Sequence, residues 1–442
     1  MQSRANNILA SQMKRWYKLK DHPVQIALIN HLNDGVRFPV VPAGRRSGKT
    51  ERFKRFIAKQ AMKNAGEKYF IAAPTYGQVK KIYWQDMKAF TLSATHDRKP
   101  SETDLIIYMP NMTEIHLIGL DKPERIEGIP WTGGGIDEIA DVKPNAWAEN
   151  ILPALNTVNP ERPDYRAWCW LLGVPDGLNH YYEMAQYAET ANDPEWRCYH
   201  WKSAEILPPD VIESARRVMS ARQFKQEFEA SFETASGRIY EDYSSDNYTS
   251  ESILPHEKLC WYHDFNYTPL SSGIGVIRGN DVYMLDEIVL TGAVASQSAL
   301  EFVNKFKDHK NKSVNIYGDP SGRAGEKHGH ESDYTEIERV LRSHGWQFTR
   351  KVKPSTRSIK DGQNAVRAKI KNAAGDVSLY VNPKTAPWTH KSLSTGQLKE
   401  GSTFLEDETS EYQHIGTAVR YFIDFEYPVV SNKPQKVQVL GL

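Results

Sequence analysis

The chain has few cysteines and no long apolar run. Its 442 residues include Cys169, Cys198 and Cys260, which are widely spaced and form no CxxC pair. We therefore expect buried free thiols rather than a disulfide framework or a zinc knuckle. The longest apolar runs, such as residues 167–174, are far shorter than the roughly 20 residues that a membrane span needs. The basic N-terminus leads into no apolar signal core, so we expect an intracellular protein with no membrane partner.

An excess of charge of one sign is also missing. The 56 Lys and Arg residues face 55 Asp and Glu residues, which gives a formal net charge of +1. This balance excludes a histone-like protein, so any site for nucleic acid must be a local patch. Hydrophobic residues make up 40% of the chain and charged residues 25%, as in average globular proteins, and we find no internal repeat or low-complexity tract. The length predicts two or three domains with a sizeable core.

Short apolar runs alternate with helical patterns in the first half of the chain, which is typical of an α/β fold with a parallel sheet. The predicted strands are residues 36–42, 69–73, 105–109, 114–118, 135–137 and 167–173. Residues 105–109 and 114–118 are expected to form a hairpin. The helical pattern of residues 209–232 indicates a satellite subdomain within residues 191–236.

The polar segment 237–257 lacks sustained periodicity and marks a domain boundary. Beyond it the pattern changes to three strands, with Gly279-Asn280 as a hairpin turn, followed by alternating helices and strands. The predicted strands are residues 259–265, 273–278, 281–289, 313–317, 347–352 and 378–381, and the final helix is 409–425. We therefore predict a first domain at residues 1–236, a linker at 237–257 and a mixed-sheet domain at 258–442.

A phosphate-binding loop of the Walker A type is predicted between the strand 36–42 and the helix that follows it. Its candidate nucleotide-binding residues are Gly44, Arg45, Arg46, Ser47, Gly48, Lys49 and Thr50. Glycine allows backbone N–H groups to turn toward phosphate, Lys49 neutralises the β- and γ-phosphate oxygens, and the Thr50 hydroxyl can hold Mg²⁺. Ala43 stands where the first glycine of the pattern is usual. The pattern predicts ATP as the ligand.

Asp137 and Glu138 follow the predicted strand that contains Gly133-Gly134-Gly135. In a phosphate-loop enzyme, the first acid holds Mg²⁺ through water and the second polarises the attacking water. Three glycines make a poor strand, so a surface Asp-Glu turn is the alternative. The phosphate loop upstream favours the catalytic interpretation.

Three further positions carry weaker signals. Gln25 lies upstream of the loop and could hydrogen-bond an adenine edge, although a solvated helix residue fits as well. Arg125 could reach the γ-phosphate of the same or a neighbouring subunit as an arginine finger, and so could Arg45 or Arg46. Ordinary solvated arginines are the alternative for each of them.

Two acids follow predicted strands of the second half. Asp264 ends the first strand of the three, and Asp319 follows the strand 313–317. Carboxylates at neighbouring strand ends are what two-metal phosphodiester cleavage needs, because they hold two Mg²⁺ or Mn²⁺ ions close together. A single Asp at a strand end is usually a turn residue, so each alone is weak evidence. Together they indicate a nuclease site on a ribonuclease-H-like sheet.

A third metal ligand is expected near the final helix, where His414, Thr417, Tyr421 and Asp424 share one face. Several acids and one histidine compete for this role. The candidates are Asp424, His414, Glu406, Asp407, Glu408 and Glu411. A nuclease with fewer ligands, or a solvated polar helix face, is the alternative.

Taken together, these motifs resemble the large terminase subunit of tailed bacteriophages, the DNA-packaging motor, over nearly the whole chain. The segments that carry the resemblance are 44–50 (GRRSGKT), 133–141 (GGGIDEIAD), 173–183 (GVPDGLNHYYE), 263–269 (HDFNYTP), 318–322 (GDPSG) and 414–421 (HIGTAVRY). The resemblance implies an ASCE-type P-loop NTPase domain followed by a ribonuclease-H-like nuclease domain. Val174 and Thr417 depart from the family pattern, which carries a Ser or Thr and an Asp at these two positions.

The resemblance also implies a function. An ATPase would drive double-stranded DNA into a procapsid, and a metal-dependent endonuclease would cut concatemeric DNA. The implied partners are double-stranded DNA, a small terminase subunit, a portal and further copies of the chain in a ring, in the host cytoplasm and docked transiently on the procapsid. One alternative is a helicase-nuclease of DNA repair, which would need a second motor domain that we do not find. The other is a translocase whose C-terminal domain binds DNA without cutting it, as Thr417 suggests.

Overall fold

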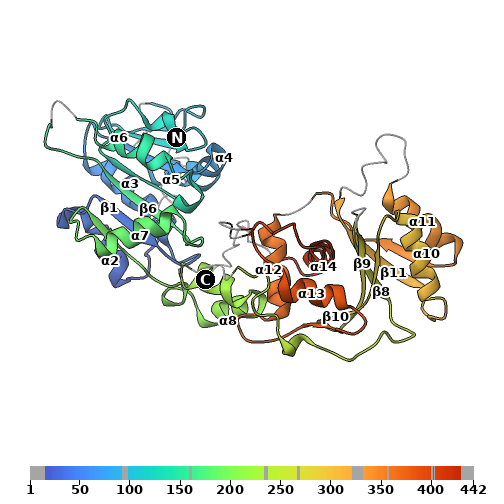
Figure 1. Cartoon of the computed structure of the whole chain (residues 1–442). Coiled ribbons are helices and arrows are strands. Elements are labelled where there is room, and N and C mark those ends of the chain that lie inside the picture. Colours follow the sequence, from blue (N-terminus) through green and yellow to red (C-terminus); the bar gives the residue numbers. More distant parts are fainter. Residues whose placement is uncertain are drawn as a thin grey trace. The chain divides into compact units, whose positions relative to one another are not determined.

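The computed structural model describes residues 15–91, 98–158, 162–232, 237–265, 269–320, 332–355, 358–399, 402 and 404–429. The chain divides into two compact units, residues 1–212 with 225–233 and residues 213–224 with 234–442. Each unit has its own sheet (Figure 1). The domain limits expected from the sequence, with a linker at 237–257, stay a prediction. Among the described residues, no helix is both long and apolar enough to cross a membrane.

The first unit contains a seven-stranded sheet in the order β3-β4-β2-β5-β6-β1-β7. Its strands are β1 (Phe38–Pro42), β2 (Lys68–Ala73), β3 (Ile106–Tyr108), β4 (Glu114–Gly119), β5 (Gly133–Ile136), β6 (Trp168–Gly173) and β7 (Trp196–Cys198). The predicted hairpin is confirmed, because β3 pairs antiparallel with β4. The other neighbouring pairs are parallel, as expected. The strand β6 lies between β1 and β5, so the loop after β1 and the acids after β5 reach the same edge of the sheet.

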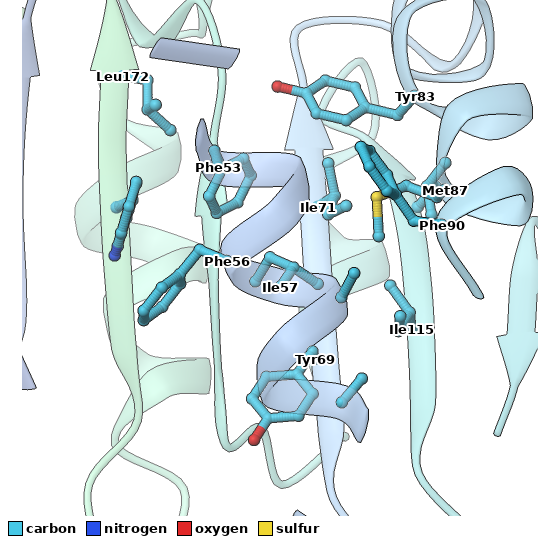
Figure 2. Packing of buried hydrophobic residues seen from close by; sticks show 14 of the residues in the cluster. Phe53, Phe56, Ile57, Tyr69, Ile71, Tyr83, Met87, Phe90, Ile115 and Leu172 are labelled. Carbon is cyan, nitrogen blue, oxygen red and sulfur yellow. The ribbon is translucent and has the colours of Figure 1, made fainter. Parts of the chain in front are cut away.

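Helices cover both faces of this sheet. They are α2 (Pro23–Ile29), η1 (His31–Asp34), α3 (Lys49–Lys63), α4 (Tyr76–Val79), η2 (Lys80–Trp84), α5 (Gln85–Thr91), η4 (Pro123–Ile126), η5 (Ile139–Asp141), η6 (Trp147–Ile151), α6 (Leu152–Leu155), α7 (His180–Thr190) and η7 (Ser203–Glu205). Side chains alternate along a strand, so Ile71 and Leu172 pack toward α3 and α5, whereas Phe70 and Leu171 pack toward α6 and α7. Figure 2 shows Phe53 and Phe56 of α3 packed on the face of the sheet that carries Ile71 and Leu172.

The glycines of β5 have a packing reason. An added Cβ at Gly135 would lie 2.6 Å from Phe53 Cζ, and at Gly133 and Gly134 it would meet the rings of Trp168 and Phe70. The strand is buried throughout. Glycine costs strand propensity, but here it makes room for large rings on both faces. This explains why a poor strand sequence forms the centre of the sheet.

The second unit contains a six-stranded sheet in the order β12-β11-β8-β9-β10-β13. Its strands are β8 (Leu259–Asp264), β9 (Leu270–Arg278), β10 (Asp281–Leu290), β11 (Ser313–Gly318), β12 (Gln347–Arg350) and β13 (Leu379–Val381). The three antiparallel strands β8, β9 and β10 are confirmed, and β11 and β12 add to them in parallel. This is the mixed sheet of a ribonuclease-H-like fold that the sequence predicts.

The helices of the second unit also lie on two faces of its sheet (Figure 1). They are α10 (Ala295–Lys305), α11 (Asp333–Ser343), α12 (Ile359–Ile370), α13 (Pro387–Thr395) and α14 (Gln413–Glu426), with η8 (Ser245–Asn247) before the sheet. Trp261 and Ile316 pack with α10 and α11, and their neighbours Tyr262 and Tyr317 pack with α12 and α14. Two of the limits between the units fall within α8 (Pro209–Val218) and α9 (Ala221–Phe228).

Candidate active sites

The loop between β1 and α3 has the conformation of a phosphate cradle. Arg46 and Gly48 adopt left-handed φ angles of 59° and 88°, and they turn the chain sharply into the first turn of α3. The backbone N–H groups of a first helical turn have no acceptor within the helix, so they attract anions. Lys49 begins α3 and is 6% exposed. The loop can therefore bind a phosphate chain with backbone dipoles and one ammonium group.

Gly44 is required for packing rather than for its φ angle. An added Cβ would lie 2.6 Å from the backbone nitrogen of Ser203 and 2.7 Å from the carbonyl oxygen of Phe228. The Ser203 hydroxyl also donates to the Arg45 carbonyl at 2.7 Å. The base of the loop therefore rests directly on the chain around η7 and α9.

Gln25 supports the loop from behind. It is 2% exposed, its amide nitrogen donates to the Ser47 carbonyl at 2.9 Å, and its amide oxygen accepts from Arg52 at 2.8 Å. Trp201 donates to the same Ser47 carbonyl at 3.2 Å. The alternative of a solvated helix residue is therefore wrong for Gln25. Its contact with an adenine edge stays a prediction.

The three candidate arginines have different surroundings. Arg45 forms an ion pair with Glu227, with 2.7 Å between Nε and Oε2. Arg46 is exposed at the tip of the loop. Arg125 lies on η4 with 44% of its side chain exposed, and its Nη1 is 4.0 Å from Asp121 Oδ2. The role of an arginine finger stays a prediction for each of them.

The Asp137 carboxylate meets the first turn of α3. Asp137 is 2% exposed, and its Oδ2 accepts a hydrogen bond from the Thr50 hydroxyl at 3.0 Å. The backbone N–H of Glu138 donates to the other carboxylate oxygen at 3.1 Å. A hydroxyl beside a carboxylate is the oxygen donor set that Mg²⁺ prefers, so these residues fit the implied cation. Ser47, three residues before Thr50, has a buried hydroxyl with no hydrogen-bond partner in the part of the chain that the structure describes.

Sequence reasoning assigned no role to Tyr83, which belongs to the same site. Its hydroxyl donates to Asp137 Oδ2 at 2.5 Å. Burial and the adjacent Asp137 raise the pKa of Tyr83 well above its usual value, so the hydroxyl remains a donor. In the sequence, Tyr83 is one of several apolar residues on a helical pattern, and that periodicity predicts a core position and nothing more.

Glu138 takes a backbone conformation that is rare for a residue other than glycine, with φ at 53°. Burial raises the pKa of its carboxyl, the charge of Asp137 adds to this effect, and that of Lys49 opposes it. The backbone N–H of Val174 lies 3.5 Å from Glu138 Oε2. Val174, where the family pattern has a Ser or Thr, therefore contacts Glu138 through its backbone N–H.

The segment 173–183 is fastened to the chain that follows Glu138. Asn179 donates to the Ala140 carbonyl at 3.3 Å, and the His180 ring contacts the Ile139 carbonyl at 2.9 Å. Asn179 also caps α7 by accepting from the backbone of Tyr181. A shift of Glu138 would therefore move the start of α7.

Asp264 and Asp319 meet at one edge of the second sheet. Gly318 pairs with His263 across the parallel strands β11 and β8, which places the two acids at neighbouring strand ends. Asp264 is 6% exposed. Burial raises the pKa of Tyr421, and the charges of Asp319 and Asp264 raise it further. This tyrosine from α14 thus lies beside both carboxylates, as the predicted helix face requires.

The other residues of that face have separate partners. His414 Nδ1 lies 3.1 Å from Asp264 Oδ2, and this hydrogen bond raises the pKa of His414. Thr417 is 6% exposed and accepts from the Gln413 amide at 3.0 Å. Asp424 forms an ion pair with Lys353, with 2.7 Å between Oδ2 and Nζ.

The acids before α14 have different surroundings, and the charge of Glu408 is close enough to His414 to help raise its pKa. Glu406 pairs with Arg420 at 3.0 Å, and Asp407 accepts from the backbone of Thr409 at 3.0 Å. Glu408 and Glu411 are exposed. Within the described residues, no group of three His, Cys, Asp or Glu side chains is arranged to hold a metal ion. The two strand-end carboxylates fit a divalent cation by their chemistry, and the third ligand stays a prediction.

Comparison with known proteins places these sites in context. Residues 41–243 match the family model described as terminase large subunit, T4likevirus-type, N-terminal. The large terminase subunit of Escherichia phage T5 is 26% identical over 231 residues, and that of Thermus virus P23-45 is 22% identical over 254 residues. Each match covers 50% of this chain and 50% of the relative. The chain therefore matches about half the length of these relatives.

Solved structures extend the likeness to both units. The large terminase of a thermophilic bacteriophage matches with a TM-score of 0.59 at 17% identity, over 91% of this chain and 98% of that chain. The same protein in complex with ATP-gamma-S matches with a TM-score of 0.58 at 17% identity. The two units thus share the fold of that protein.

Proposed function

We propose that this chain, which is similar to the large terminase subunits of tailed bacteriophages, is the ATP-driven motor that packages viral DNA and cuts it. The observation that carries the proposal is the presence of two separate phosphate-directed sites, one in each unit. Thr50 in the first turn of α3 donates to Asp137 after β5, and Asp264 and Asp319 lie at the ends of neighbouring strands of the other sheet. One site suits a nucleotide and the other suits a phosphodiester.

At the first site, the residues of the chain would bind ATP and orient a water. Lys49 and the first-turn N–H groups of α3 hold the phosphates, and Glu138 accepts a hydrogen bond from the attacking water. A bound Mg²⁺ would be held by Thr50 and, through water, by Asp137, and would neutralise phosphate charge. Release of the γ-phosphate would then change the charge that faces Glu138, and the contact with Val174 would pass this change to α7.

At the second site, Asp264 and Asp319 would hold divalent cations, Mg²⁺ or Mn²⁺, which supply charge stabilisation for the cleaved phosphodiester. His414 orients the Asp264 carboxylate through its hydrogen bond. Asp424 could join as a third ligand only by releasing Lys353. The charge at this site is therefore partly balanced by side chains of the chain itself.

The partners follow from the same proposal. Double-stranded DNA would be held through its phosphates, which fits translocation without sequence reading. The chain would act as a ring in the host cytoplasm, with the small terminase subunit and the portal as partners during docking on the procapsid. In such a ring an exposed Arg125 would be placed to serve a neighbouring subunit.

Two variants test the proposal by opposite losses. Lys49→Ala should reduce ATP turnover about 100-fold or more, since it removes the charge that faces the phosphates, and leave plasmid cutting with Mn²⁺ intact. Asp264→Asn should abolish cutting and leave ATP turnover unchanged. Phosphate release and plasmid nicking measure the two activities in the full chain. Parallel loss of both activities in both variants would contradict the assignment of two sites.

A further inference from the structure

Tyr83 reaches the nucleotide site from a short π-helical turn. This turn, η2, interrupts the helical segment between α4 and α5. A π turn inserts one residue into a helix and re-aims the side chains around it, and such turns are frequent at functional sites. Tyr83 is fully buried, and its hydroxyl is aimed at Asp137 Oδ2, the same oxygen that accepts from Thr50.

The ring of Tyr83 is held so that this hydroxyl has little freedom. Phe53 packs edge-on against it with 6.3 Å between ring centroids, and Lys54 Nζ lies 5.0 Å from the ring centroid. Lys54 is in turn fixed by an ion pair with Asp86 at 2.8 Å. Phe53 and Lys54 both lie on α3, directly after the phosphate loop. The ring is thus tied to the helix that carries Thr50.

A buried tyrosine hydroxyl needs a hydrogen-bond partner, and a backbone carbonyl would satisfy it. Here the partner is a buried carboxylate whose other neighbours are Thr50 and the backbone of Glu138. Two donors on one oxygen fix the orientation of the carboxylate plane. Partners of this kind, which orient the groups around a metal, typically change metal affinity or activity 10- to 100-fold when they are removed.

We propose that Tyr83 is a positioning residue that holds the Asp137 carboxylate in register with the Thr50 hydroxyl for a magnesium-bound nucleotide. This inference rests on the proposed ATP site and assigns a role to a residue outside its sequence motifs. Tyr83 would touch neither the nucleotide nor the cation. Loss of its hydroxyl would change how nucleotide binding depends on the Mg²⁺ concentration. It would leave the affinity for the nucleotide without Mg²⁺ unchanged.

Tyr83→Phe removes one oxygen and keeps the ring. The matched control is Tyr69→Phe, because Tyr69 is also buried in the first unit and its hydroxyl accepts from Asn64 at 3.0 Å. Figure 2 shows the two rings at opposite ends of α3. In the full-length chain, binding of a fluorescent non-hydrolysable ATP analogue is measured across a Mg²⁺ titration and again in EDTA, with thermal melting to verify folding.

Tyr83→Phe should raise the Mg²⁺ concentration for half-maximal binding roughly 10- to 100-fold and leave the affinity in EDTA unchanged. Tyr69→Phe should change neither quantity. In an Asp137→Asn background, Tyr83→Phe should add little, because the carboxylate that it orients is gone. This comparison within the Asp137→Asn background still tests the role of the hydroxyl if Tyr83→Phe lowers the melting temperature.

Two results would overturn the inference. A folded Tyr83→Phe variant with an unshifted Mg²⁺ midpoint would show that the hydroxyl serves packing only. An equal loss of affinity with and without Mg²⁺ would place the effect on the nucleotide pocket as a whole. A wild-type chain that binds no nucleotide in either condition would overturn the proposed function as well, which separates that failure from failure of the inference alone.

Discussion

The two candidate sites are supported in different ways. In the first unit, Thr50 and Tyr83 both donate hydrogen bonds to Asp137, and the strand before Asp137 packs between aromatic rings. In the second unit, Asp264 and Asp424 are balanced by His414 and Lys353 from other segments. The first site thus depends on packing and the second on charge. Core substitutions should damage the first, and substitutions that change charge should retune the second.

Acid should weaken the core beneath the first site, where His31 is fully buried. Its Nδ1–H donates to the Leu28 carbonyl, and its Nε2 accepts from Trp170 Nε1, so the ring is neutral. Burial lowers the pKa of His31 from 6.5 to about 4. As pH falls below 6.5, His31 takes up a proton in the unfolded chain before it does so in the folded chain. The folded state therefore loses stability progressively between pH 6.5 and about pH 4.

The expected loss is roughly 3 kcal/mol between neutral pH and pH 4, since each pKa unit corresponds to about 1.4 kcal/mol. The free energy of unfolding is measured by urea unfolding at a series of pH values. The transition of the first unit is identified as the one that added ATP shifts. His31→Gln should flatten the pH dependence, whereas His200→Gln, at an exposed position of the same unit, should keep it. If the free energy of unfolding of His31→Gln depends on pH as steeply as that of the wild-type chain, groups other than His31 cause the acid sensitivity.

These residues also show where sequence reasoning ends. A phosphate loop is a run of consecutive residues, so its strand, turn and helix were predictable. The three antiparallel strands β8, β9 and β10, the first of which ends at Asp264, were predictable from a turn dipeptide and alternating residues. The contacts of Gln25 and Glu227 with the loop, and of Tyr83 with Asp137, come from distant segments, and no local pattern encodes them. The glycines of β5 suggested a weak strand because the rings that need their space lie elsewhere in the sequence.

The packing support of the first site is tested directly at Gly134. Gly134→Ala would drive a methyl group into the ring of Phe70 and should cost about 1 to 3 kcal/mol, as overpacking of a core does. Gly77→Ala makes the same change in α4 where nothing lies within 4 Å, and should stabilise the unit by about 0.5 to 1 kcal/mol. Urea midpoints compare the two variants. Equal effects would remove the packing argument for β5.

The charge support of the second site is tested at Thr417, where the family pattern has Asp. Thr417→Asp places a carboxylate on a buried face of α14, where Gln413 already donates to the residue at this position. The Mg²⁺ or Mn²⁺ concentration for half-maximal plasmid cutting should fall about tenfold, because an added carboxylate offsets the charge of a bound cation.

The same variant should be less stable without metal, since burial disfavours a charged carboxylate and Gln413 is already shared with Glu406. Added Mn²⁺ should therefore raise its melting temperature more than that of the wild-type chain. Thr409→Asp, at an exposed position before α14, is the control and should change neither quantity. If Thr417→Asp melts lower but shows no gain from metal, the face of α14 at residue 417 is outside the metal site, and the second site works with the two strand-end acids and His414.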